Sequence, residues 1–173
     1  MKNLLYIATF ILAGMTATAQ NFNKVGNLPK VSETYITGEM FKMISGIDSE
    51  DPEFNELMKS VGNLTELRVY TTQNASSAIQ MKKFTDDFVT TSKMPLLMSV
   101  KEGNQKFTFH ARKGSSDSKV KNLVMFIEGM DNNMADSVLL VISGDIDLNQ
   151  IAKITEKMDV PGQRQIEKAT KGN

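Results

Sequence analysis

The sequence contains no cysteine, and this absence excludes several kinds of chemistry at once. Disulfides, thiol nucleophiles and thiolate metal sites all need the sulfur that the chain lacks. The lipidated cysteine that anchors bacterial lipoproteins is excluded for the same reason. The chain also has no tryptophan and only 7% aromatic residues, which weakens any function based on stacking against sugars.

The chain has no excess of positive or negative charge, because 20 basic side chains balance 20 acidic ones. No basic block and no surface of alternating basic and aromatic residues is present, which argues against nucleic acid as a partner. Neither a Gly-rich phosphate loop nor an H-E-x-x-H pair occurs. We therefore predict no nucleic-acid partner and no cofactor.

The N-terminus has the layout of a secretory signal peptide. A short positive start, Met1–Asn3, precedes the apolar run Leu4–Met15, and Ala17–Ala19 supplies the small-x-small pattern that signal peptidase recognises. The apolar run is too short for a membrane span, which takes about 20 apolar residues. We expect cleavage after Ala19 and export of a chain that begins at Gln20, to the periplasm or outside the cell.

The sequence predicts a signal peptide at 1–19, a polar leader at 20–35, a single α+β domain at 36–158 and a polar C-terminal tail at 159–173. A chain of about 150 residues buries roughly two thirds of its unfolded surface, which is enough for one core. No second apolar span follows the signal peptide, so we expect a soluble domain without a transmembrane anchor.

Helical periodicity and capping residues predict about four helices. They cover residues 36–47, 52–61, 74–92 and a segment that begins after Asp147. In the first helix, five apolar residues lie on one stripe that we expect to pack in the core: Ile36, Met40, Met43, Ile44 and Ile47.

Methionine is frequent, with 12 residues in the chain. Exported Cu(I) proteins use thioether ligands, and the spacing of Met40 and Met43 presents both on one helix face. However, nearly every methionine falls on an apolar stripe, and methionine is a flexible core filler. We interpret the methionines as core residues and predict no metal ligand among them.

Period-two patterns and short turns predict about five strands, at 64–72, 96–101, 105–112, 119–128 and 136–143. The fold class is therefore α+β, a mainly antiparallel sheet of about five strands packed with about four helices. Because 123–127 and 138–142 are continuous apolar runs, we expect these two strands to pair at the centre with both faces covered. Helices cover one face in this hypothesis, and the other is covered by the remaining helices or by a second copy, as a homodimer through the sheet face.

His110 is the only histidine, so acid–base or metal chemistry would begin there. It lies on the polar side of its strand with Thr108 and Arg112, with no carboxylate near it in sequence and no G-x-S-x-G motif in the chain. Because catalysis needs partners that this pattern does not supply, we interpret His110 as a surface residue.

Asp145 and Asp147 are two residues apart at an expected strand-to-helix turn, where their oxygens suit Ca²⁺ or Mg²⁺. The EF-hand pattern is absent, and Asp147 suits the N-cap of the following helix. We similarly interpret the segment Asp131–Asn133 as a turn rather than as a set of metal ligands. We predict no catalytic, cofactor-binding or metal residue; an enzyme would need His110, Asp145 and Asp147 to converge in one cleft.

The stretch Leu96–Lys101, a turn, a strand and then Val138–Ile151 resemble the domain-of-unknown-function family 4252. The similarity spans roughly Phe41 to Met158, and its most specific element is the junction Gly144–Leu148. The resemblance implies a small exported single domain of the kind found chiefly in Bacteroidota-type bacteria. It implies no activity, substrate or catalytic residue.

Two classes of function remain open on this sequence. The first is a non-catalytic envelope module that binds a protein, a peptide or a lipid. The second is a small exported hydrolase or metal-dependent enzyme with a carboxylate site. Missing catalytic motifs and doubly apolar central strands favour the binding module, while the identity of the envelope partner or ligand stays undetermined.

Overall fold

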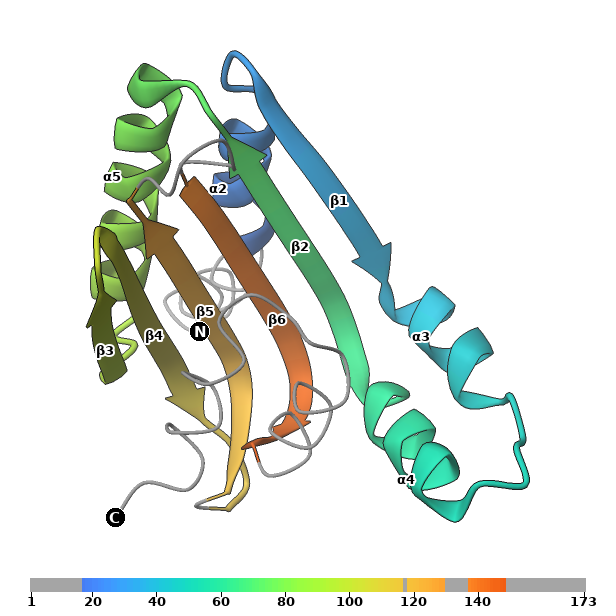
Figure 1. Cartoon of the computed structure of the whole chain (residues 1–173). Helices are drawn as coiled ribbons and strands as arrows, with labels where there is room; N and C mark the ends of the chain where they lie inside the picture. Colours follow the sequence, from blue (N-terminus) through green and yellow to red (C-terminus); the bar gives the residue numbers. More distant parts are fainter. Residues whose placement is uncertain (1–16, 117, 130–136, 149–173) are drawn as a thin grey trace, which may run out of the picture.

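The computed structural model describes residues 17–116, 118–129 and 137–148, and these form one antiparallel sheet with helices (Figure 1). The six strands lie in the order β1-β2-β6-β5-β4-β3. The strands are β1 Val31–Thr37, β2 Leu64–Thr72, β3 Leu96–Glu102, β4 Gln105–Lys113, β5 Lys119–Glu128 and β6 Ser137–Asp147. The helices are α2 Ala17–Gly26, α3 Gly38–Ser45, α4 Pro52–Val61 and α5 Ala75–Thr91. The α+β class and the antiparallel sheet are confirmed, with six strands in place of about five.

The additional strand, β1, lies in the segment that we expected to be a polar leader. It forms one edge of the sheet and pairs only with β2, so most of its residues are exposed. An exposed edge strand shows little hydrophobic periodicity, which explains why the sequence pattern did not reveal it. The helix before it, α2, buries Phe22 and Val25 in the core, so this segment is part of the fold.

Local capping explains where three of the helices begin. Thr37 ends β1 and accepts a hydrogen bond from the backbone N–H of Met40, so α3 starts after it and not at Ile36. Asn74 accepts from the backbone N–H of Ser77 at 3.0 Å and starts α5, as predicted. Pro52 occupies the first position of α4, where its missing N–H costs nothing.

The main core lies between the sheet and the pair of helices α2 and α5, which cover one face (Figure 1). Five hydrophobic side chains there are completely buried: Val25, Tyr70, Met81, Val124 and Leu139. The rings of Phe22 and Phe88 meet edge to face with their centroids 4.6 Å apart, which joins the two helices. The strands β5 and β6 are neighbours at the centre of the sheet, as their continuous apolar runs predicted.

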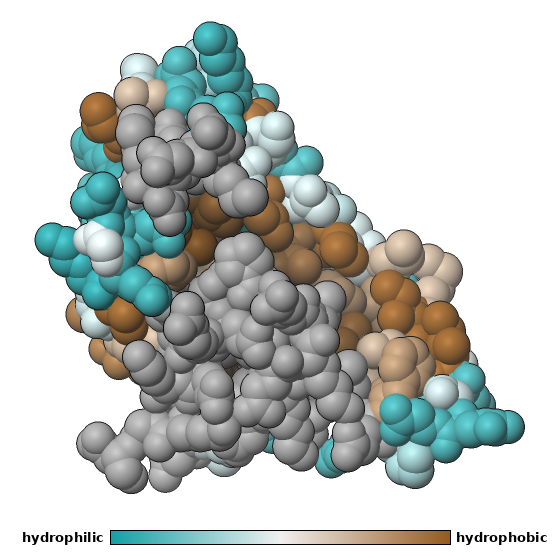
Figure 2. Space-filling model, in the orientation of Figure 1, coloured by the Kyte–Doolittle hydropathy of each residue, from teal (hydrophilic) through white to brown (hydrophobic). Residues whose placement is uncertain are grey.

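The opposite face of the sheet also carries apolar clusters, and Figure 2 shows hydrophobic residues on the part of this face that it leaves uncovered. Phe107 and Phe109 of β4 and Met125 of β5 are only 3–6% exposed and form a second cluster on this face. Ala111, Leu123 and Ile146 belong to a third cluster, with Leu148 packed against it. Both faces of the central strands are therefore apolar, while the two predicted covers, further helices or a second copy, stay predictions.

The helices α3 and α4 pack on each other beyond one end of β1 and β2, apart from α2 and α5 (Figure 1). Phe41 is the buried side chain of α3, at 6% exposure. The predicted helix after Asp147, the tail at 159–173 and the turn Asp131–Asn133 lie outside the described residues. We refer below to α3, α4 and their connection as the α3–α4 unit, residues 38–61.

Candidate functional site

His110 takes part in holding the chain after α5 against the sheet. Its ring Nδ1 lies 3.2 Å from the carbonyl oxygen of Met94, and the tautomer protonated at Nδ1 donates this hydrogen bond. Met94 itself is 5% exposed and follows α5 into β3. The contact fixes the histidine ring against a backbone carbonyl.

The aspartates of the Gly144–Leu148 junction belong to the end of β6 and not to a turn after it. Asp145 accepts a hydrogen bond from the ammonium group of Lys119 on β5 at 2.5 Å, and this bond raises the pKa of Lys119. The backbone N–H of Asp145 also donates to the carbonyl of Asn63 at 3.1 Å. The predicted capping of a further helix by Asp147 concerns residues outside the described part.

Gly144 has a backbone conformation and a close backbone neighbour that favour glycine at this junction. Its φ of +140° is a conformation that side-chain-bearing residues rarely adopt. A Cβ at this position would lie 2.5 Å from the carbonyl oxygen of Asn63, where no side chain fits. At the junction that carries the family resemblance, Gly144 therefore allows β6 to pair closely with the start of β2.

The strand register keeps the candidate residues of the enzyme hypothesis apart. His110 lies opposite Val124 on β5, whereas Asp147 lies opposite Lys119 and Ile146 opposite Val120. Five residues of strand, about 17 Å at roughly 3.3 Å per residue, separate the level of His110 from that of Asp147, and β5 lies between the two strands. Among the residues that the structure describes, no three histidine or acidic side chains form a group that could hold a metal ion.

The most elaborate polar cluster surrounds Arg68 of β2, whose side chain is 8% exposed. Its NH1 group donates to Asn23 of α2 at 2.9 Å and to Glu33 of β1 at 3.4 Å, and its Nε donates to Glu66 at 3.2 Å. The hydroxyl of Tyr70 donates to Glu33 at 2.9 Å and accepts from Arg68 at 3.4 Å. The cluster ties α2, β1 and β2 together.

Burial and charge shape the ionisation of this cluster. Burial alone would lower the pKa of Arg68, but hydrogen bonding to Tyr70 and the charge of Glu66 outweigh it and hold the pKa above its ordinary value. Burial raises the pKa of Tyr70 to about 12, with the hydrogen bond to Glu33 acting in the same direction. The guanidinium carbon of Arg68 also lies 4.1 Å from the ring centroid of Tyr35, a cation–π contact.

A small cavity of about 120 Å³ lies beside this cluster. On its polar side the amide of Asn122 donates to the hydroxyl of Ser143 at 3.0 Å, and that hydroxyl donates to Glu66 at 3.4 Å. Small-molecule sites usually offer roughly 300 Å³ or more, so the cavity is too small for a ligand of that kind. No buried side-chain polar atom in the described part of the chain lacks a hydrogen-bond partner. The Arg68 cluster is thus a structural network in which the polar groups satisfy one another.

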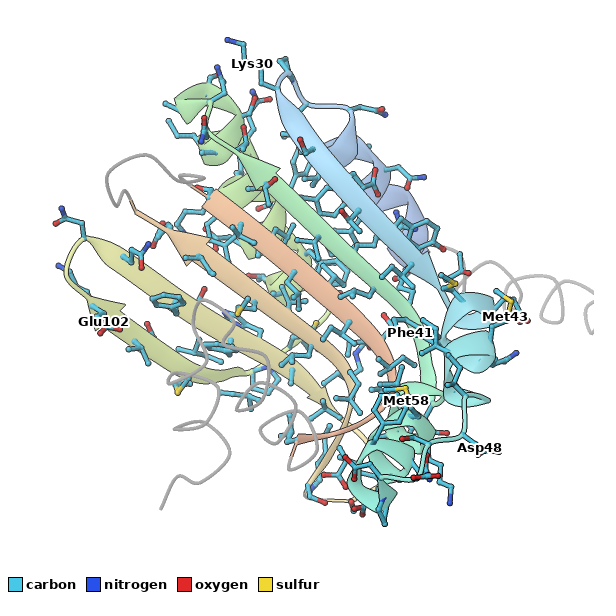
Figure 3. All side chains as sticks on the ribbon, turned by 45° about the vertical axis from the view of Figure 1, so that its right-hand side comes forward. Lys30, Phe41, Met43, Asp48, Met58 and Glu102 are labelled. Atoms are coloured by element: carbon cyan, nitrogen blue, oxygen red, sulfur yellow. The ribbon has the colours of Figure 1, made fainter. Side chains whose placement is uncertain are left out.

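The region of α3 is different, because it carries apolar side chains that the described part of the chain leaves about half or more exposed. Met40, Met43 and Ile47 are 46%, 68% and 54% exposed. We call these three residues the α3 patch. Figure 3 shows Met43 on the side of α3 away from the strands, and Phe41 on the side that faces them. The prediction that Met40, Met43 and Ile47 lie in the core is wrong, because Phe41, off the expected stripe, makes the packing contact.

The methionine prediction therefore divides into two outcomes. Met81, Met94 and Met125 are 0–6% exposed and fill the core, as expected. Met40 and Met43 lie on the surface of α3, and the sequence signal that could have revealed this was Phe41, which shares a helix with them on another face. The Arg68 network could not be found from sequence, because β1 supplies Glu33 and Tyr35 and was not predicted as a strand.

The α3–α4 unit is acidic, although the whole chain is neutral. Its 24 residues carry six carboxylates and two lysines, a net charge of −4. One lysine, Lys42, already binds Glu39 one turn away at 2.8 Å. Asp48 and Glu50 of the connection are exposed, and Figure 3 places Asp48 beyond the end of α3. The candidate functional site is thus an exposed apolar patch in an acidic surrounding.

The sheet order, the two packed helices and the projecting α3–α4 unit define a small α+β domain in which all strands are antiparallel. The comparison with family models makes the class specific: residues 22–154 match the family described as Domain of unknown function (DUF4252). The chain belongs to this family. No curated protein and no solved structure matches it significantly. In the described residues, no helix combines the length and the hydropathy that crossing a membrane requires.

Proposed function

We propose that this protein is an exported, non-catalytic module that binds a partner in the cell envelope through the α3 patch. The observation that carries this proposal is the exposure of Met40 and Met43 on α3 and of Ile47, which follows the C-cap of this helix. Single exposed hydrophobic residues are ordinary on protein surfaces, but contiguous ones mark interaction sites. The described part of the chain exposes seven large hydrophobic side chains, and four of them fall between Tyr35 and Ile47.

The geometry of α2 supports export with cleavage after Ala19. Although α2 begins at Ala17, the contacts with the rest of the domain that the structure describes for this helix include those of Phe22, Asn23 and Val25, which all follow the expected cleavage site. A chain that begins at Gln20 keeps these contacts. Removal of the signal peptide is therefore compatible with the fold of the domain.

The enzyme alternative receives less support from the same geometry. It needs His110 and the two aspartates of β6 in one cleft, whereas the register separates His110 from Asp147 by about 17 Å along the sheet. Asp145 is engaged with Lys119, and His110 contacts the carbonyl of Met94. A binding role needs only residues that stay exposed in the folded domain. It does not require His110, Asp145 and Asp147 to lie in one cleft.

Site-specific photo-cross-linking in the native envelope tests the binding role. A photoreactive residue at position 43 should capture a defined partner, and the same residue at position 79 of α5 should not. Ile79 is the matched control because it is 72% exposed on a different helix. The capture should be lost when Met40→Gln is added. Equal labelling from both positions, or none from position 43, would contradict the proposal.

N-terminal sequencing of the protein recovered from the periplasm or the medium tests the export. We expect a chain that begins at Gln20. An uncleaved chain that stays in the cytoplasm would overturn the proposed export. The cross-linking test of the α3 patch does not depend on that result.

A further inference from the structure

We propose that the partner is a cationic amphipathic helix, which lays its apolar face on the α3 patch while its basic residues meet the carboxylates of the α3–α4 unit. This inference rests on the proposed function and names the chemistry of the partner. Three features of the unit carry it: the spacing of the patch, its methionine content and its charge.

The spacing of the patch suits a helix laid alongside α3. Met40 and Met43, at i and i+3, are neighbours on the surface of α3, and Ile47 follows directly after the C-cap residue of the helix. A turn holds Ile47 close to the end of α3, because the backbone N–H of Ile47 donates to the carbonyl of Ile44 at 3.1 Å. A patch of this length suits the apolar face of an amphipathic helix, which presents residues at similar spacing.

Methionine makes such a patch adaptable. Its unbranched side chain and polarisable sulfur follow the shape of different apolar partners, which is why it is common on surfaces that accept varied sequences. Met43, at 68% exposure, is the most exposed residue of the patch. The contact would therefore recognise an apolar helical face rather than one fixed side chain.

Charge selects among the occupants that an apolar patch can take. The net charge of −4 on the α3–α4 unit repels a second copy of the same surface and an anionic lipid surface. It attracts a basic segment, and opposite charges around an apolar contact mainly raise the association rate and the specificity. Asp48 and Glu50, which follow Ile47 in the connection to α4, are both exposed and can meet basic residues that flank an apolar face.

The test uses two synthetic helical peptides and the purified protein. One peptide is amphipathic and built from leucine and lysine, and the other has glutamate at every lysine position. We expect the lysine peptide to bind at least tenfold more tightly than the glutamate peptide in fluorescence anisotropy. Its affinity should fall when salt is raised from 0.05 to 0.3 M, since screening shortens the reach of surface charges to below about 10 Å.

Variants assign the binding to the patch and its charge. The pair Met40→Gln with Met43→Gln should weaken the lysine peptide at least tenfold, and Asp48→Asn with Glu50→Gln should weaken it at least threefold. Ile79→Gln on α5 is the matched control and should change the affinity less than twofold. Circular dichroism of each variant checks that the fold is retained.

Two results would overturn the inference. Equal affinity for both peptides would remove the preference for cations, and binding that survives the double methionine substitution would place the contact elsewhere. The inference would also be overturned if the protein bound vesicles of phosphatidylglycerol and phosphatidylethanolamine through Met40 and Met43 in place of the peptide. The α3 patch would then be a lipid-binding surface. If position 43 cross-links to a neutral or acidic partner, the proposed function holds but the inference of a cationic helix is wrong. If position 43 cross-links to no partner, both the proposed function and this inference are wrong.

Discussion

The helix-covered core and the α3–α4 unit use apolar residues in opposite ways. Between the sheet and helices α2 and α5, residues such as Tyr70, Met81 and Leu139 are completely buried. In the α3–α4 unit, the same residue type, methionine, stands on the surface at positions 40 and 43. The first region gains stability by removing apolar area from water, at roughly 25 cal/mol per Å². The second region leaves part of its apolar area exposed to water, and binding of a partner can bury that area.

This difference separates the residues that hold the fold from those available for binding. The polar groups follow the same division. Arg68 is surrounded by groups that satisfy it inside the domain, whereas Asp48 and Glu50 face solvent on a unit of net charge −4. Substitutions should therefore fall into two classes, one that changes the free energy of unfolding and one that changes binding.

The largest effect on stability should come from Leu139→Ala at the centre of the sheet. Leu139 is completely buried in β6 between Tyr70 of β2 and Phe126 of β5. Truncation leaves a cavity and should lower the free energy of unfolding by about 2–5 kcal/mol. Urea denaturation measures this change, and Leu139→Met, which nearly conserves volume, should cost less than about 1.5 kcal/mol. Equal midpoints for both variants would contradict the placement of Leu139 in the main core.

A smaller loss should follow Arg68→Met, which removes the cation from the network that joins α2, β1 and β2. Breaking a fully buried pair costs about 3–5 kcal/mol, but Glu33 and Glu66 keep 31% and 24% of their side-chain exposure, so water relieves part of the cost. We expect a loss of about 2 kcal/mol in the free energy of unfolding, measured in urea.

The control for this variant adds Glu33→Gln and Glu66→Gln to Arg68→Met. Removing the two unpaired charges should restore about half of the lost stability. No recovery would mean that the packing of the arginine stem, and not the charge network, made the contribution.

Tyr70 should make stability depend on pH in the alkaline range. Its pKa in the folded protein, about 12, lies above the value of roughly 10 for an exposed tyrosine, so the folded state favours the neutral phenol. The contribution is complete below pH 10 and is lost as the pH rises towards 12. Between pH 9 and 12, the native protein should lose about 1–2 kcal/mol more stability than Tyr70→Phe.

Tyr35→Phe serves as the control for this titration, because Tyr35 is half exposed on the edge strand. The native protein and Tyr35→Phe should lose stability in parallel over the same pH range. If Tyr70→Phe followed the native curve instead, the buried phenol would not be the titrating group.

The strands and helices with strong periodicity were predictable from sequence because local patterns determine them. The boundaries of β5 were predicted as observed, and the cap of α5 at Asn74 followed from residue type alone. The central pairing of β5 with β6 followed from two continuous apolar runs. These features depend on short-range chemistry and on burial that the sequence displays directly.

Features that depend on distant partners were not predictable. The strand β1 is recognisable only by its pairing with β2, and without β1 the partners of Arg68 could not be assigned. The orientation of α3 failed for a related reason. Its apolar residues occupy more than one face, and the single buried contact of Phe41 decides which face meets the strands. Periodicity identified the helix, and tertiary packing selected its side.

The smallest effect on stability should come from the substitution with the largest effect on binding. Met40 and Met43 are 46% and 68% exposed, so changing both to glutamine removes little buried apolar area. Glutamine and methionine have similar helix propensities, so α3 should persist. The free energy of unfolding in urea should change by less than about 0.5 kcal/mol, as expected for surface positions, and no more than in the Ile79→Gln control. A loss above about 2 kcal/mol would place these side chains in the cooperative core and remove the division between folding residues and binding residues.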